Sequence, residues 1–173
     1  MFRALQRRVG DMATIRALCL AAEAHAHKDG QREPGAEHFL LAAFDLPDGT
    51  ARRALERVGV APEQFKAAIA VQYANALSAI GLTADIDAEP EAPGPAAGVY
   101  QAGPSGAEIM QKLAAQRPFG GPPLVGADVV AVVATLRRGV SAQALRTMDV
   151  DLEALRLAAI KESGAARSGS KPN

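Results

Sequence analysis

Apolar residues recur along most of this chain at the spacing of an α-helix, and Gly or Pro interrupts the pattern at intervals. The segment 11–28 shows this spacing first, and Asp29-Gly30 supplies its stop. The apolar face of this segment is formed by Ile15, Leu18, Cys19 and Ala22. The pattern predicts seven further helices, which lie within the segments 34–46, 50–58, 62–73, 105–117, 125–136, 142–148 and 152–160.

The segment 125–136 is the one ambiguous case. It is rich in Val and, taken alone, has the composition of a buried strand. Its counterpart in an internal repeat is the segment 36–44, which has a helical pattern. We therefore predict a helix at both places.

The internal repeat begins where Gly35–Ala42 returns about ninety positions later as Gly126–Val133. At an offset of 90, identities then follow at Gly49 and Gly139, Ala54 and Ala144, Leu55 and Leu145, Val60 and Val150, Glu63 and Glu153, and Ala68 and Ala158. This pattern indicates an internal duplication. We predict an all-α fold in which two four-helix repeats, related by a pseudo-twofold axis, form one eight-helix domain, because neither repeat alone would bury much surface.

The repeats set the expected domain boundaries. Repeat 1 spans residues 1–80 and repeat 2 spans residues 105–162, where Ser105 and Glu108 have the spacing of a capping box. The segment 81–104 contains four prolines and four acids but no Lys or Arg, so we expect an extended linker. The polar segment 163–173 is expected to be a disordered tail.

Composition narrows the function classes. Hydrophobic residues make up 49% of the chain and aromatics only 4%, so the core must be built from small aliphatic side chains. The formal net charge is zero, which argues against nucleic acid or an anionic membrane as a partner. The single cysteine permits no internal disulfide, and no apolar run approaches 18 residues. A cytoplasmic location is the expectation.

Several motifs resemble one known family. They are Met1-Phe2, the run Glu37–Ala42, the turn at Gly49, and the segment Ala54–Val60. Together they resemble the Clp amino-terminal repeat, which is the substrate- and adaptor-docking domain at the front of Clp-type AAA+ unfoldases. The resemblance covers most of residues 11–162, and repeat 1 fits better than repeat 2. Two departures are clear: Ala36 and Ala127 stand where the family has Thr, and repeat 2 has Asp128-Val129 in place of Glu-His.

The resemblance implies a non-catalytic protein-binding domain that acts as an adaptor, decoy or modulator of a Clp unfoldase or protease. Its partners would be a Clp AAA+ unfoldase, the adaptors of that unfoldase, or tagged substrate proteins. No Gly-x-x-x-x-Gly-Lys-Ser/Thr motif occurs, so we expect a stand-alone Clp-N protein rather than an unfoldase. The alternative is a sensor of small molecules such as cyclic-peptide antibiotics, which would use an apolar surface around Phe2, Phe39 and Phe44.

Glu37 and Asp128 are the candidate binding residues, because both open the second helix of a repeat. In some family members the corresponding acids receive the guanidinium of phosphoarginine, and a carboxylate can accept two parallel N–H donors from such a group. The alternative is that both acids only stabilise a helix N-terminus, by about 0.3–1 kcal/mol.

No catalytic, metal or cofactor site is expected from the sequence. His25, His27 and His38 are the only histidines, and two of them are two positions apart, so on a helix they point in different directions. No Cys or acid completes a ligand set around them. We therefore expect the histidines to be structural or exposed, and the protein not to be an enzyme.

Overall fold

The computed structural model describes residues 2–79, 81, 101–116 and 121–169, and the side chains from residue 11 onward. Within these ranges the chain forms helices and no strand, so the predicted all-α class is confirmed. The eight helices are α1 (Phe2–Lys28), α2 (Ala36–Asp45), α3 (Thr50–Glu56), α4 (Pro62–Ala79), α5 (Pro104–Ala115), α6 (Gly126–Val133), α7 (Val140–Thr147) and α8 (Leu152–Gly169). The Val-rich segment is helix α6, as the repeat predicted.

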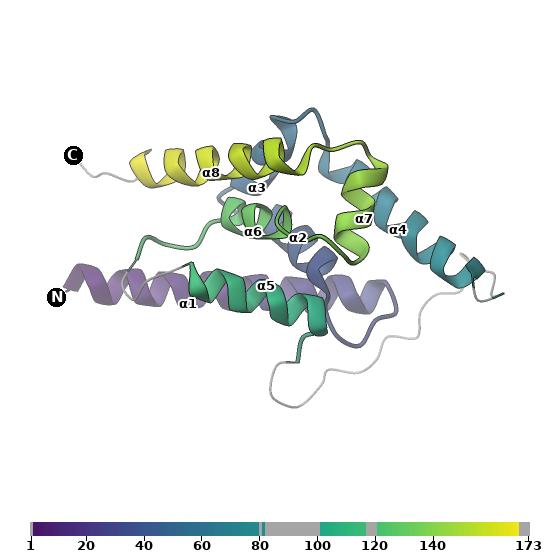
Figure 1. The fold of residues 1–173 in the computed structure, drawn as a ribbon. Helices are drawn as coiled ribbons and strands as arrows, with labels where there is room; N and C mark the ends of the chain where they lie inside the picture. Colours follow the sequence, from purple (N-terminus) through teal and green to yellow (C-terminus); the bar gives the residue numbers. More distant parts are fainter. Residues whose placement is uncertain (1, 80, 82–100, 117–120, 170–173) are drawn as a thin grey trace.

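Helices α2 and α6 lie at the centre of the fold (Figure 1). The α1 and α5 helices pack on one side of them, and α3 and α8 pack on the other. The residues 36–44 of α2 are all buried, which explains why this helix is apolar on every side. Side chains from both halves of the chain, 2–81 and 101–169, join one hydrophobic core, in which Phe44 and Phe65 make an edge-to-face contact.

Apart from the contacts made by α2 and α6, the main helix contacts between the halves are two. Helix α3 packs against α8, and α4 packs against α7. The first of these contacts contains an ion pair, because the buried carboxylate of Glu162 accepts hydrogen bonds from Arg53 at 2.8 Å and from Arg57 at 2.5 Å. The hydrogen bond from Arg53 is the main reason why the pKa of Glu162 lies below its usual value. Neither half therefore completes its packing alone.

The short helices α3 and α7 begin in the same way. Gly49 precedes α3 and Gly139 precedes α7, and both have positive φ, at 64° and 96°. Glycine reaches this region without a steric penalty. The helices that follow, α4 and α8, begin at Pro62 and Leu152 and each contain 18 residues. The starts of α3 and α7, and those of α4 and α8, thus lie 90 positions apart, as the sequence identities do.

Two expectations about boundaries need correction. Ser105 is not the N-cap of its helix: α5 begins at Pro104 after Gly103, and the Ser105 hydroxyl instead accepts a hydrogen bond from the Ala36 N–H at 3.1 Å. The expected tail is also wrong in its first part, because α8 continues to Gly169 and buries Ser163. The residues 82–100 of the expected linker and the residues 170–173 of the expected tail lie outside the described ranges.

Among the helices of the described ranges, none combines the length and apolarity needed to cross a membrane.

Candidate functional site

The start of α6 is held by the first half of the chain. The turn between α2 and α3 supplies the Asp48 carboxylate, which accepts from the Gly126 N–H at 3.1 Å, and the Thr50 hydroxyl, which accepts from the Ala127 N–H at 2.8 Å. The first amides of a helix have no intrahelical acceptor, so these contacts satisfy them. Gly126 is required here because an added Cβ would lie 2.8 Å from the Ala43 carbonyl oxygen.

Asp128, which belongs to α6 itself, provides the remaining hydrogen-bond acceptor at this helix start. It is the third residue of α6, and its Oδ2 accepts a hydrogen bond from the Val125 N–H at 3.1 Å. The side chain of Val125 has no polar atom, so the cap depends on Asp128. This arrangement turns the carboxylate toward α8.

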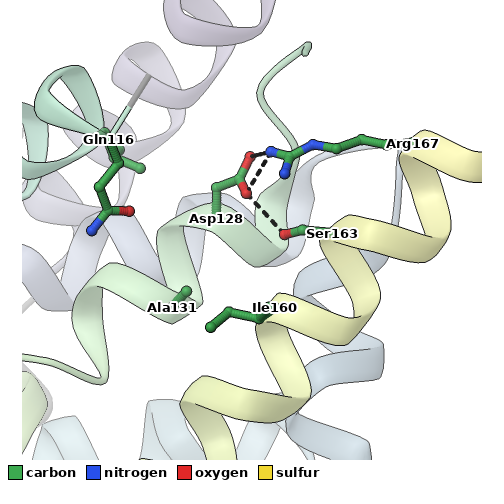
Figure 2. A pocket seen from close by; sticks show the side chains of 7 residues that line it. Gln116, Asp128, Ala131, Ile160, Ser163 and Arg167 are labelled. Carbon is green, nitrogen blue, oxygen red and sulfur yellow. Dashed lines mark hydrogen bonds and ion pairs between the residues drawn. The ribbon is translucent and has the colours of Figure 1, made fainter. Parts of the chain in front are cut away.

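Two side chains of α8 meet the Asp128 carboxylate (Figure 2). The Ser163 hydroxyl donates to Oδ1 at 2.8 Å, and Nη2 of Arg167 lies 2.8 Å from both Oδ1 and Oδ2. The Asp128 side chain is 15% exposed and that of Arg167 is 32% exposed. The ion pair therefore lies at the surface of the fold, with one face open to solvent.

A pocket of about 190 Å³ opens beside this ion pair, and its lining residues are Leu113, Gln116, Asp128, Ala131, Ile160, Ser163 and Arg167. Figure 2 shows Gln116, at the end of α5, across the pocket from α8. The polar groups lie around Asp128, whereas Ala131 and Ile160 give the pocket an apolar side. Ile160 is 48% exposed and forms part of this lining. The pocket thus combines a carboxylate with an apolar surface, as a site for an amphipathic side chain requires.

Glu37 lies in a different environment. Its side chain is only 6% exposed, and its Oε1 accepts a hydrogen bond from the Tyr73 hydroxyl at 2.7 Å. The carboxylate folds back over Gly35, where an added Cβ would lie 2.6 Å from Oε1. Burial, followed by the charge and hydrogen bond of Glu37, raises the pKa of Tyr73 well above its usual value. The Glu37 carboxylate is therefore shielded from solvent and hydrogen-bonded inside the fold.

The cap of α2 comes from His38 rather than Glu37. His38 is the third residue of the helix, and its Nδ1 accepts from the Gly35 N–H at 2.9 Å. The proton of the neutral ring is then on Nε2, which lies 3.3 Å from Asp29 Oδ2 without reaching hydrogen-bond geometry. His38 is almost fully buried and has no nitrogen free to act as a base.

This geometry shows that Glu37 and Asp128, which the sequence analysis treated as equivalent, occupy different positions in their helices. Counted from the helix start, Asp128 matches His38, and both cap the N–H three residues before them. Glu37 is one position earlier in its helix. The two acids still share one partner type, because Tyr73 and Ser163 are 90 positions apart and each donates a hydroxyl to the acid of its own half.

The other expected site residues do not form a site. Phe39 is fully buried and Phe44 is 4% exposed, so the prediction of an apolar ligand surface at these positions is wrong. The side chain of Phe2 lies outside the described part of the structure. His25 pairs with Asp45 through Nε2 and Oδ2 at 2.7 Å. Over the residues that the structure describes, no three His, Cys, Asp or Glu side chains are grouped to hold a metal ion.

Ser163 and Arg167 are the site residues that sequence reasoning missed, because both fell in the expected tail. A signal was available: Ile160, Ser163 and Arg167 are spaced three and four apart, which places them on one face if the helix continues.

No protein-family model matches this chain, and no curated protein matches it in sequence.

Proposed function

We propose that the chain is a non-catalytic protein-interaction domain of the Clp amino-terminal type, and that it binds an arginine side chain of its partner at Asp128. The contact between Asp128 and Arg167 carries the proposal, because it is a carboxylate–guanidinium pair at the edge of a pocket. A carboxylate in that position suits the guanidinium of another chain equally well, since two parallel N–H donors match its two oxygens. The apolar side of the pocket suits the methylene groups of an arginine.

The helix packing supports the two-repeat part of the proposal. Exchange of the two halves by a twofold axis converts the contact of α3 with α8 into the contact of α7 with α4, and both contacts occur. The central contact of α2 with α6 is converted into itself. The turn glycines Gly49 and Gly139 and the hydroxyls of Tyr73 and Ser163 keep the same offset of 90.

The burial of the two acids favours Asp128 over Glu37 as the binding residue. A ligand at Glu37 would have to displace the Tyr73 hydroxyl from a carboxylate that is almost inaccessible to solvent. The Asp128 side chain is 15% exposed and lines the pocket, and one of its partners is Arg167, which lies near the end of α8. We therefore assign the ligand to Asp128 alone.

The matching experiment is a titration with small arginine compounds. Nα-acetylarginine methylamide and phosphoarginine are added to the wild type, to Asp128→Asn and to Glu37→Gln, and binding is followed by NMR or calorimetry. We expect Asp128→Asn to weaken binding by about tenfold or more, since a hydrogen bond between charged groups contributes about 1.5–3 kcal/mol. Glu37→Gln should bind as the wild type does.

Two controls make this titration specific. Nα-acetyllysine methylamide carries the same charge without the planar guanidinium, so it should bind more weakly. Comparison of the two arginine compounds shows whether a phosphoryl group adds affinity or removes it. Equal binding of arginine by the wild type and by Asp128→Asn would contradict the proposal.

The partner protein in this proposal is a Clp AAA+ unfoldase, one of its adaptors, or a tagged substrate. This identity follows from the resemblance of the Glu37–Ala42 run and the Ala54–Val60 segment to the Clp amino-terminal repeat. Affinity purification with mass spectrometry tests it directly. We expect a Clp ATPase or its adaptor to be enriched with the wild type and lost with Asp128→Asn, and enrichment of neither would remove this partner class.

A further inference from the structure

Two arginines of α3 share one carboxylate of α8. Arg53 and Arg57 lie one turn apart on this side of the fold, and each donates from its Nε to a different oxygen of Glu162, at 2.8 Å and 2.5 Å. The Glu162 side chain is only 4% exposed, whereas those of Arg53 and Arg57 are 50% and 44% exposed. A buried acid therefore holds two half-exposed guanidinium groups next to each other at the surface.

The outer ends of the two guanidinium groups are almost unused. Within the described ranges, the only hydrogen bond from an Nη atom of the pair runs from Nη2 of Arg53 to the Asp48 carbonyl oxygen, and its 3.3 Å is long for such a bond. The Nη atoms of Arg57 make none there. Two guanidinium groups and one carboxylate leave one positive charge among these three side chains.

The contact of α4 with α7 shows that this charge is not needed for packing. Each member of the ion pair has a neutral counterpart 90 positions away: Gln72 for Glu162, Gln143 for Arg53, and Thr147 for Arg57. There the Gln72 amide donates to the Thr147 hydroxyl at 3.0 Å. Uncharged groups thus suffice where α4 packs against α7, and a buried ion pair contributes little net stability over such groups. The two arginines exceed what the α3–α8 contact requires.

The charge and the geometry of this arginine pair fit a carboxylate ligand. The Nη–H groups of a guanidinium bind the oxygens of carboxylates and phosphates. A carboxylate carries one negative charge and balances the charge that Glu162 leaves, whereas a phosphate monoester carries about 1.5 to 2 and would exceed it. Because Glu162 already orients both arginines, binding costs little further ordering of their side chains.

We infer that Arg53 and Arg57 form a second binding site, which takes a carboxylate from an acidic segment of a partner protein. This site is separate from the one proposed at Asp128. Glu162 and Ser163 are adjacent in α8, but Glu162 bonds to α3 and Ser163 bonds to α6. None of the three members of the ion pair lines the pocket. The inference therefore stands or falls independently of the arginine site.

A titration with a short acidic peptide tests the inference. An Nα-acetylated, amidated Gly-Glu-Gly peptide is added to the wild type, to Arg57→Gln and to the matched control Arg52→Gln, and binding is followed by NMR. Arg52 lies on the same helix, but its Nε donates to the Phe44 carbonyl oxygen instead. We expect Arg57→Gln to bind about threefold to tenfold more weakly, as for the loss of one partly exposed charged contact. Arg52→Gln should bind as the wild type does.

Two further ligands test the chemistry of the site. The neutral Gly-Gln-Gly peptide, acetylated and amidated in the same way, should not bind, and inorganic phosphate should bind no more tightly than the acidic peptide. Equal binding of the neutral peptide overturns the inference, and tighter binding of phosphate overturns its assignment to a carboxylate. Asp128→Asn should bind the acidic peptide as the wild type does, which separates this result from that of the proposed function.

The chain itself suggests a variant that removes the charges without leaving one unpaired. Arg53→Gln/Arg57→Thr/Glu162→Gln gives the α3–α8 contact the residues of the α4–α7 contact. It should keep the helical circular dichroism of the wild type and lose the acidic peptide, and peptide binding by this folded variant would overturn the inference. In the wild type alone, the peptide should shift the Nε–Hε NMR signals of Arg53 and Arg57 but not that of Arg52. Unmoved signals of the pair at saturation would overturn the inference even if the triple variant did not fold.

Discussion

The starts of α2 and α6 are built from the same parts and have opposite properties. Each has an acid in its first turn and receives a hydroxyl from the last long helix of its own half, Tyr73 for Glu37 and Ser163 for Asp128. At α2 the acid is almost inaccessible, whereas at α6 the acid lines a pocket. Tyr73 is a larger residue than Ser163, and in the proposed function this difference in volume separates a structural acid, Glu37, from a binding acid, Asp128.

The two helix starts also depend on opposite halves of the chain. Ser105, in the second half, accepts from the Ala36 N–H at the start of α2, and Thr50, in the first half, accepts from the Ala127 N–H at the start of α6. The halves therefore cap one another. A change at either contact should destabilise the whole fold rather than one half, and the following changes test the two starts from the largest expected effect to the smallest.

Gly106→Ala should give the largest loss of stability. It acts beside the start of α2, which we call the sealed start because its acid, Glu37, is almost inaccessible to solvent. An added Cβ at Gly106 would lie 2.2 Å from the Pro34 carbonyl oxygen and 3.0 Å from the Phe39 ring, and neither can move without shifting the backbone or the core. Overpacking of this kind costs about 1–3 kcal/mol and sometimes more, so we expect a loss of about 3 kcal/mol in the free energy of unfolding. Urea denaturation measures it.

Gly164→Ala is the matched control for Gly106→Ala. Gly164 lies within α8 and has no atom within 4 Å of an added Cβ. Because Ala is the better helix former, this variant should gain up to about 1 kcal/mol. A loss of similar size in both glycine variants would show that close packing of α5 against α2 is not the cause.

Thr50→Val should give the next largest loss of stability. It acts at the start of α6, which we call the open start because its acid, Asp128, lines the pocket. Thr50 is fully buried, and its hydroxyl accepts from the Ala127 N–H and donates to Asp48. The isosteric valine leaves the amide without this partner, which costs about 1–3 kcal/mol. Thermal and urea unfolding should both report the loss, with a single transition because the halves share one core.

Thr147→Val provides the comparison for Thr50→Val. Thr147 is exposed at the end of α7, where its hydroxyl donates to Gln143 of its own helix and accepts from Gln72 of the first half. Surface changes of this type are usually within about 0.5 kcal/mol. If Thr147→Val destabilised the protein as much as Thr50→Val, burial of the contact between the halves would not explain the effect.

Removal of the two equivalent hydroxyls compares the starts directly. Tyr73→Phe leaves the buried Glu37 carboxylate without the hydrogen bond from the Tyr73 hydroxyl, so we expect a loss of about 1–2 kcal/mol in the free energy of unfolding. Ser163→Ala should cost about 0.5–1 kcal/mol, since Asp128 keeps the Val125 N–H and Arg167. If Ser163→Ala lowered the free energy of unfolding more than Tyr73→Phe does, the start of α6, and not that of α2, would be the sealed one.

The helices could be predicted from the sequence, but the site could be predicted only in part. Apolar periodicity and the internal repeat identified the eight helices, and the repeat resolved the Val-rich segment of α6. Asp128 was found because it opens a helix. Ser163 and Arg167 were missed because polar composition was taken as disorder, although a helix end is polar wherever one face is open to solvent.

The register of the two acids was missed for a different reason. The match of Gly35–Ala42 with Gly126–Val133 is offset by 91 and aligns Glu37 with Asp128, whereas the offset of 90 of the six later identities aligns His38 with Asp128. The hydrogen bond to the residue three positions earlier follows the offset of 90. Which residue caps a helix depends on the backbone angles at its start, and a one-position shift leaves the apolar pattern intact. Burial of Glu37 by Tyr73 is likewise a tertiary effect with no local signal. The two-repeat Clp-type arrangement stays a prediction.

Alkaline pH should give the smallest loss of stability, and this loss reports on Tyr73 at the start of α2 alone. The pKa of Tyr73 is raised in the folded protein, by burial first and by Glu37 second. Between the unfolded pKa near 10 and the higher folded value, the unfolded chain loses a phenol proton that the folded chain keeps, so stability falls as pH rises. The loss is at most about 0.8 kcal/mol at pH 10.5, and solvent screening at the half-buried phenol reduces it. The free energy of unfolding at pH 8 and pH 10.5 should therefore fall more in the wild type than in Tyr73→Phe, whereas Ser163→Ala should follow the wild type. An equal fall in all three proteins would mean that the Tyr73–Glu37 contact is not sealed from solvent.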